Sequence, residues 1–155
     1  MTLKNGSPRR AVQWRRDHGM LGIDTNILLR IFPTDLSEGD HTPDQFALVR
    51  AAVVGSREPF FVNHMVVVET IWVLRQKLKY SKEVIAGVMT RLLHMSNVMV
   101  QDAATVEASL SSFIAFPGDF SDHLIGEINK RNGCRTTLTF DRAASKSPNF
   151  SELQR

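Results

Sequence analysis

Apolar residues recur along the chain in two patterns, short uninterrupted runs and longer stretches with helical spacing. The short runs at 21–23, 59–62 and 98–100 and the β-branched run at 136–140 predict strands. Helical spacing and helix-start residues predict helices over 25–32, 43–54, 64–79, 81–95, 103–116 and 119–132. Strands that alternate with helices favour an α/β fold with a short, mainly parallel central sheet covered on both faces.

The composition is that of one domain. The 155 residues suffice for one full core, and no apolar run approaches the roughly 18 to 20 residues that span a bilayer. The one cysteine, Cys134, excludes an internal disulfide and a cysteine-based zinc site. These features predict a cytoplasmic protein without a membrane segment.

The formal net charge of +3 comes from the first 19 residues, which hold five basic side chains against Asp17. The remainder holds 14 of the 19 basic and 15 of the 16 acidic side chains, so it is nearly neutral. We expect a basic, disordered extension over 1–19 and one domain over 20–155. Three interpretations would explain the extension: a transit peptide, a basic arm for nucleic acid, or a start of translation upstream of Met20. We favour Met20 as the natural start, because the first strand follows it directly.

Acidic residues occupy positions that would bring them together in a parallel sheet. Asp24 and Asp141 each follow a predicted strand, and Asp122 lies in the first turn of a predicted helix. Glu69 lies in an apolar helical stripe, between neighbours three and four residues away: Met65, Val66, Trp72 and Val73. The carboxyl ends of parallel strands share one edge, so we expect these acids to converge. Two carboxylates about 4 Å apart repel by roughly 4 kcal/mol at an effective dielectric near 20, so either protons or a metal ion must relieve the repulsion.

Each acid also has an ordinary structural interpretation. Asp24, with Thr25 and Asn26, is typical of a helix cap, and Asp119 and Asp122 complement a helix dipole. Asp141 with Arg142 is compatible with a turn and a surface ion pair. Glu69 has no arginine in register on its own helix, so its alternative is a buried pair with Arg30 or Arg50.

A site made of carboxylates alone selects Mg²⁺, or Mn²⁺, over zinc or copper. Such an ion lowers the pKa of bound water and stabilises charge on a phosphate, which points to phosphodiester hydrolysis. The sequence has neither a Walker-type loop nor the motif G-x-G-x-x-G, which argues against nucleotide cofactors.

Four motifs, in order, resemble those of PIN-domain nucleases, in particular VapC-type toxins of bacterial toxin–antitoxin pairs. They are Ile23–Arg30, Val68–Thr70, Asp119–Ile125 and Thr137–Arg142, and the resemblance covers residues 20 to about 153. It implies a PIN-like three-layer α/β/α domain, and it gives the 1–19 extension no counterpart. It implies that four acids are catalytic: Asp24, Glu69, Asp122 and Asp141. Of these, Asp24 and Asp122 would be the direct metal ligands. It implies additional positions at Asp119, Asn26 and Thr139, whereas His123 is either a flanking side chain or a contact to the substrate.

The first hypothesis is a Mg²⁺-dependent endoribonuclease toxin that cleaves cellular RNA (tRNA, rRNA or mRNA). The resemblance implies 5′-phosphate and 3′-hydroxyl products, a homodimer, and an antitoxin that places an arginine or lysine in the acidic pocket. Candidate phosphate contacts are Arg30, Arg75, Lys77, Lys79, Lys82, Lys130, Arg131, Arg135 and Arg142. Each basic cluster is also compatible with a solvated helix face, and the apolar face at Val84, Val88 and Leu92 suits either core or interface.

Two other hypotheses are non-catalytic. A receiver-like Mg²⁺-binding regulatory module would carry a lysine at the end of a late strand, but Asp141 follows Phe140 here. A PIN-like domain that has lost catalysis would bind RNA or a partner without cutting, and the full acid set argues against it.

Overall fold

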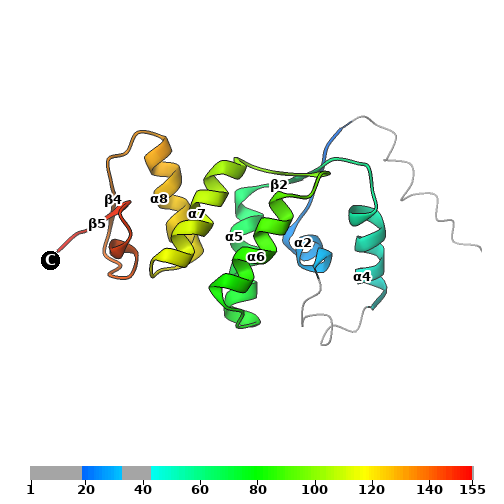
Figure 1. Cartoon of the computed structure of the whole chain (residues 1–155), viewed down its shortest axis with the longest axis horizontal. Coiled ribbons are helices and arrows are strands. Elements are labelled where there is room, and N and C mark those ends of the chain that lie inside the picture. Colours follow the sequence, from blue (N-terminus) through cyan, green and yellow to red (C-terminus); the bar gives the residue numbers. More distant parts are fainter. Residues whose placement is uncertain (1–18, 33–42, 155) are drawn as a thin grey trace, which may run out of the picture.

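The computed structural model describes residues 19–32 and 43–154. The predicted basic extension, except Gly19, and the predicted loop before Pro43 therefore lie outside the described residues. The described part is an α/β structure with six α-helices and two small parallel sheets (Figure 1). The α/β class predicted from the sequence is thus confirmed. No helix in this part of the chain is long and apolar enough to cross a bilayer.

The helices closely follow the predicted ranges. The α-helices are α2 (Thr25–Ile31), α4 (Pro43–Val49), α5 (His64–Trp72), α6 (Lys82–Leu93), α7 (Ala103–Ala115) and α8 (Phe120–Arg131). Short turns of other helix types follow two of them and precede the last strand: η2 (Arg50–Val54), η3 (Val73–Lys77) and η4 (Ala144–Lys146).

Side-chain caps explain where several helices begin. Asp24 accepts a hydrogen bond from Ile27 N at the start of α2, and Asn63 accepts one from Val66 N at the start of α5. Ser81 caps α6 in the same way. Each cap satisfies a backbone N–H that has no partner inside its helix.

The strands are short and belong to two separate sheets. They are β1 (Leu21–Gly22), β2 (Phe60–Val62), β3 (Val98–Val100), β4 (Thr137–Thr139) and β5 (Phe150–Glu152). The first sheet has the order β1-β2-β3, and β4 pairs with β5 alone; every pairing is parallel. The sequence predicted one central sheet and did not predict β5.

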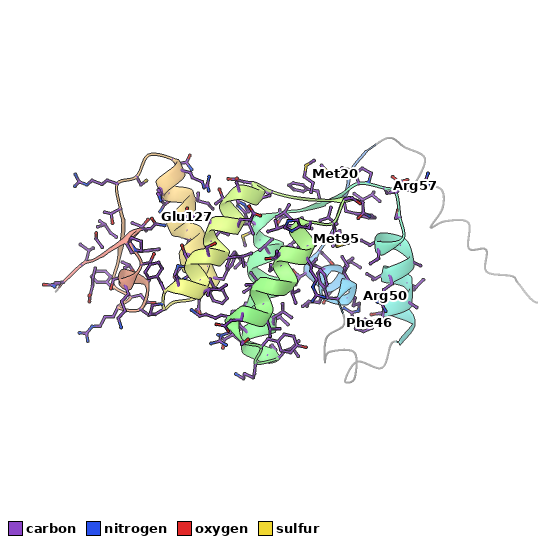
Figure 2. All side chains as sticks on the ribbon, in the orientation of Figure 1. Met20, Phe46, Arg50, Arg57, Met95 and Glu127 are labelled. Carbon is purple, nitrogen blue, oxygen red and sulfur yellow. The ribbon has the colours of Figure 1, made fainter. Side chains whose placement is uncertain are left out.

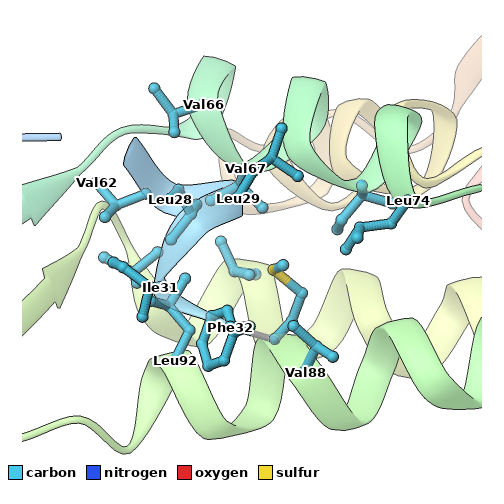
Figure 3. Packing of buried hydrophobic residues seen from close by; sticks show 14 of the residues in the cluster. Leu28, Leu29, Ile31, Phe32, Val62, Val66, Val67, Leu74, Val88 and Leu92 are labelled. Atoms are coloured by element: carbon cyan, nitrogen blue, oxygen red, sulfur yellow. The ribbon is translucent and has the colours of Figure 1, made fainter. Parts of the chain in front are cut away.

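The main core lies beside the three-stranded sheet. Side chains of α2 pack between those of α5 and α6 (Figure 3). The labelled members of this cluster are Leu28, Leu29, Ile31, Phe32, Val62, Val66, Val67, Leu74, Val88 and Leu92. Val88 and Leu92 are therefore core residues, whereas Val84 on the same helix is 50% exposed.

The two-stranded sheet is fixed to α8, and we call α8, β4, η4 and β5 together the C-terminal unit. Asn129 Nδ2 donates to Thr137 Oγ1 (3.0 Å), and Asn149 Nδ2 donates to Glu127 Oε1 (2.8 Å). Glu127 is buried on α8, at the C-terminal end of the molecule (Figure 2). Gly126 allows close approach, because a Cβ there would lie 2.7 Å from Phe150 Cε2.

Replacing Gly126 by alanine should lower the free energy of unfolding by about 1–3 kcal/mol, because the new methyl group overpacks the contact with Phe150. Urea unfolding measures the change. Gly87→Ala on α6 is the matched control, since a Cβ there meets no atom within 4 Å and alanine favours the helix by about 0.5–1 kcal/mol. Equal effects of the two substitutions would contradict the close packing of β5 on α8.

Candidate active site

The first part of the candidate site joins the end of β1 to α5. Asp24 is exposed at the start of α2, directly after the β1 segment, as predicted. The adjacent Thr25 is 8% exposed, and its Oγ1 donates a 2.7 Å hydrogen bond to Glu69 Oε2. This bond holds Glu69 next to the Asp24 segment across 44 residues of sequence. Asn26, another predicted position, is exposed on the first turn of α2.

Glu69 differs from its predicted environment, because it is an exposed residue of α5. Its helix buries a neighbouring stripe at Val66, Val67, Thr70, Ile71 and Leu74. Met65 and Trp72, one turn before and after Glu69, are 76% and 51% exposed. The helix is apolar on more than one face, so spacing alone does not identify the buried face. Among the described residues Glu69 forms no ion pair with Arg30 or Arg50.

The second part lies at the start of α8. Asp119 is exposed at the N-cap, and its backbone N–H donates to Asp122 Oδ2 (3.0 Å). The preceding Gly118 has φ +106°, and a Cβ on it would lie 3.4 Å from Asp122 Oδ2 and 3.7 Å from Ala144 Cα. The turn before α8 is therefore in van der Waals contact with both Asp122 and η4.

The third part follows β4. Asp141 Oδ1 accepts hydrogen bonds from the backbone N–H groups of Ala143 (2.7 Å) and Ala144 (3.3 Å). Thr139, predicted as an additional position, accepts from Asp141 N through Oγ1 (3.0 Å). Arg142 points away to Glu152, with Nε 3.7 Å from Oε1. Asp141 thus lies at the carboxyl end of a parallel strand, like Asp24, but on the other sheet.

The four predicted catalytic acids share one feature. In each, one carboxylate oxygen accepts a hydrogen bond from a group close to it: Ile27 N for Asp24, Thr25 Oγ1 for Glu69, Asp119 N for Asp122, and Ala143 N for Asp141. The donor in three cases is a backbone N–H two or three residues away. The local turn therefore orients Asp24, Asp122 and Asp141, whereas Glu69 is oriented by a residue 44 positions away in the sequence.

The described residues contain no ready-made metal site. Among residues 19–32 and 43–154, no group of three or more acidic, histidine or cysteine side chains is placed to hold a metal ion. Carboxylate donors suit Mg²⁺ or Mn²⁺ by their chemistry, but as arranged in one chain they do not form a donor set for either ion. The structure brings Asp24 near Glu69 through Thr25, and Asp122 near Asp119, and Asp119 lines a pocket together with Val68 and Trp72 on the Glu69 helix.

Two residues beside the acids have roles that the sequence analysis missed. The ammonium group of Lys82 donates to the carbonyls of Phe113 (2.8 Å) and Phe116 (2.9 Å), at the end of α7, and lies 4.5 Å from the centroid of the Phe113 ring. Burial and the nearby Arg75 lower the pKa of Lys82. His123 is 1% exposed beneath the same turn. Lys82 begins α6 and His123 follows Asp122 on α8. Their contacts depend on how the helices pack, so no local sequence pattern indicated them.

The unfolding free energy should depend on the protonation of His123. Burial, and then the charge of Lys82, lower the pKa of His123 below its ordinary value of 6.5. The unfolded chain therefore takes up a proton at higher pH than the folded one. Stability from the neutral ring is fully present above pH 6.5 and falls as pH drops towards the folded pKa, by at most about 1.4 kcal/mol per pH unit.

Urea unfolding of the wild type and His123→Leu between pH 7.5 and about 4.5 measures this dependence. The unfolding free energy of the wild type should fall relative to that of His123→Leu as the pH falls, because only the wild type has this titrating group. A difference that stays constant across this range would show that His123 does not titrate differently on folding.

The predicted RNA contacts are spread over the surface. Arg30 stacks on Phe46 at 5.5 Å and donates to Asn26 O, and Arg75 donates to Tyr80 O (2.9 Å). Arg131 donates to Ala104 O (3.2 Å). Lys79, Lys130 and Arg135 are exposed. Arg75 also lines a pocket between α5 and the start of α8, together with Trp72 and Asp119.

Comparison with models of known protein families and with curated proteins finds no match to this chain.

Proposed function

We propose that the chain is a PIN-like, Mg²⁺-dependent endoribonuclease of the VapC toxin type, which hydrolyses phosphodiester bonds of cellular RNA. The observation that carries the proposal is the hydrogen bond from Thr25 to Glu69, which holds two acids from distant parts of the sequence at one strand end. The position of Asp141 after a second parallel strand supports it. Resemblance to PIN-domain nucleases in the order of the acidic motifs is the remaining support.

The fold and partners follow from the same proposal. A three-layer α/β/α arrangement would place the acids on one rim of a sheet. Arg75, Lys79 and other exposed cations would contact phosphates of the RNA. An antitoxin would neutralise the acids with an arginine or lysine, as charge complementarity favours.

Each of the four acids accepts a hydrogen bond from a neighbouring group, which restrains its carboxylate. Asp24 and Asp122 would be the direct ligands of the ion, which when bound lowers the pKa of a water molecule and stabilises phosphate charge. Glu69 is held by Thr25, and Asp141 by the backbone of the turn that follows it. These hydrogen bonds keep negative oxygens at fixed positions before any ligand arrives.

A second candidate function is a PIN-like or receiver-like module that binds without catalysis, and the observation that favours it is that the described residues hold no preformed cluster of three metal-binding side chains. Metal dependence discriminates between the two. Purified protein incubated with total cellular RNA in Mg²⁺ should give defined new fragments, and excess EDTA should stop the cleavage. Restoration by added Mg²⁺ or Mn²⁺ would support the nuclease.

Cleavage that continues in EDTA would contradict the proposed metal-dependent function. RNA binding without cleavage at any Mg²⁺ or Mn²⁺ concentration would favour the non-catalytic module. Asp122→Asn, purified in parallel, controls for contaminating ribonucleases, because they would remain active in that preparation.

A further inference from the structure

One edge of β1 has no partner strand among the described residues. The backbone N–H groups of Leu21 and Ile23 donate to Pro59 O (2.9 Å) and Phe61 O (3.0 Å), on the β2 side. Backbone groups alternate along a strand, so the N–H and C=O of Gly22 point to the opposite side. Gly22 is exposed, and a Cβ there would meet no atom within 4 Å. No described residue therefore occupies this edge of β1.

β4 has a matching open edge. Thr137 N donates to Asn149 O (2.8 Å), and Thr139 O accepts from Leu153 N (2.8 Å), so the backbone groups of Leu138 point away from β5. The side chains of Leu138 and Phe140 are 62% and 67% exposed. Parallel strands are normally buried on both faces, whereas in the described part of the chain β4 is covered neither at this edge nor over Leu138 and Phe140. Unpaired edges of this kind are templates for pairing with another chain.

We propose that the two edges pair with each other between two copies of the chain, β4 of each copy adding in parallel to β1 of the other. Pairing within one chain is opposed by the attachment of β4 to α8 through Asn129 and Thr137 and through Glu127 and Asn149. In Figure 1, α7 and α8 lie between the β4–β5 sheet and the part of the molecule that contains β2 and α2. β1 belongs to that second part, because it pairs with β2. Exchange between two identical chains gives a closed, two-fold symmetric dimer in which both open edges are used.

The pairing would complete the acid set, a consequence that rests on the proposed nuclease function. Parallel pairing aligns the carboxyl ends of the two strands. Asp24 and Asp141 each lie two residues beyond the last residue of their strand, at Gly22 and Thr139. Asp24 and Glu69 of one copy would therefore meet Asp141 of the second copy at a shared rim. Each dimer would hold two such composite sites.

Cross-linking tests the pairing without any measure of catalysis. All variants carry Cys134→Ser, which removes the exposed native thiol. A chain with Gly22→Cys is mixed with a differently tagged chain with Thr139→Cys and treated with a mild oxidant, because residues directly opposite each other on adjacent parallel strands point to the same face and come within disulfide reach. A disulfide between the two tagged chains is expected. The matched control replaces Gly22→Cys by Met99→Cys on β3, the other edge strand of that sheet, 57% exposed, and should not cross-link.

Three outcomes would overturn the pairing. They are no cross-link between the mixed chains, equal cross-linking of the Met99→Cys control, and closure only within one chain when both cysteines are on it. If the cross-link forms but the wild type cuts no RNA, the pairing stands and the proposed function fails. If the wild type cuts RNA but the chains do not cross-link, the pairing alone fails.

Complementation tests whether the site is shared. Asp24→Ala and Asp141→Ala chains are each expected to be inactive alone. When they are mixed after dissociation, half of the dimers contain both chains, and one of the two sites in such a dimer is intact. Activity should recover to about one quarter of the wild type if the dimer is symmetric. No recovery in a mixture that cross-links normally would show that the acids of one site come from one chain.

Discussion

Replacing Asp24 by asparagine is expected to lower metal-dependent RNA cleavage by about 100-fold or more, with little change in stability. A bound metal ion contributes several kcal/mol to the transition state, and each 1.36 kcal/mol corresponds to tenfold in rate. Asparagine removes the negative charge but caps a helix about as well as aspartate. The hydrogen bond from Ile27 N, now 3.0 Å, should therefore be kept.

Asp24→Ala separates the two roles of this residue. It should lose activity to the same extent and, in addition, about 1 kcal/mol of unfolding free energy, because the cap of α2 is lost. Inducible expression of the wild type and both variants, with mapping of new RNA 5′ ends, measures activity, and urea unfolding measures stability. Growth arrest and the same new ends from Asp24→Asn would show that the charge of Asp24 is not used.

Replacing Phe113 by alanine should lower the unfolding free energy by about 3–5 kcal/mol, the usual cost of removing a buried phenylalanine ring. Phe113 is 1% exposed and contacts Phe120 edge to face, with ring centroids 6.0 Å apart. It also packs against His123 and lies below the Lys82 ammonium group. The substitution would leave a cavity where α6, α7 and α8 meet.

Urea unfolding measures the effect, with Phe113→Leu as the control that keeps most of the buried volume. The leucine variant should lose clearly less stability than the alanine variant. A loss below about 1 kcal/mol in Phe113→Ala would mean that the α7–α8 contact does not contribute to global stability. Such a result would also remove the basis for a rigid attachment of α8 to the rest of the molecule.

The helix starts could be predicted from the sequence because their causes are local. Asp24, Asn63, Ser81 and Asp119 each stand at the start of a predicted helix, and each is found at an N-cap position. Gly133 follows α8 with φ +88°, the conformation that glycine accepts readily at a helix end. In each case the deciding contacts lie within a few residues.

The features that were not predicted depend on contacts between distant segments. β5 has only three residues, and its pairing with β4 is formed across a turn that includes η4. The exposure of Glu69 depends on which face of an apolar helix meets the core, and α5 has apolar residues on both. The separation of β4 from the three-stranded sheet likewise depends on tertiary packing, which the spacing of residues along the chain does not predict.

The hydrogen bonds that hold one oxygen of each acid have a thermodynamic consequence. A free aspartate or glutamate loses rotational freedom when it binds a cation, and that loss weakens binding. Asp24, Asp122 and Asp141 are already restrained by backbone amides of their own turns. These restraints lower the entropic cost of orienting the three carboxylates toward any cation that they bind.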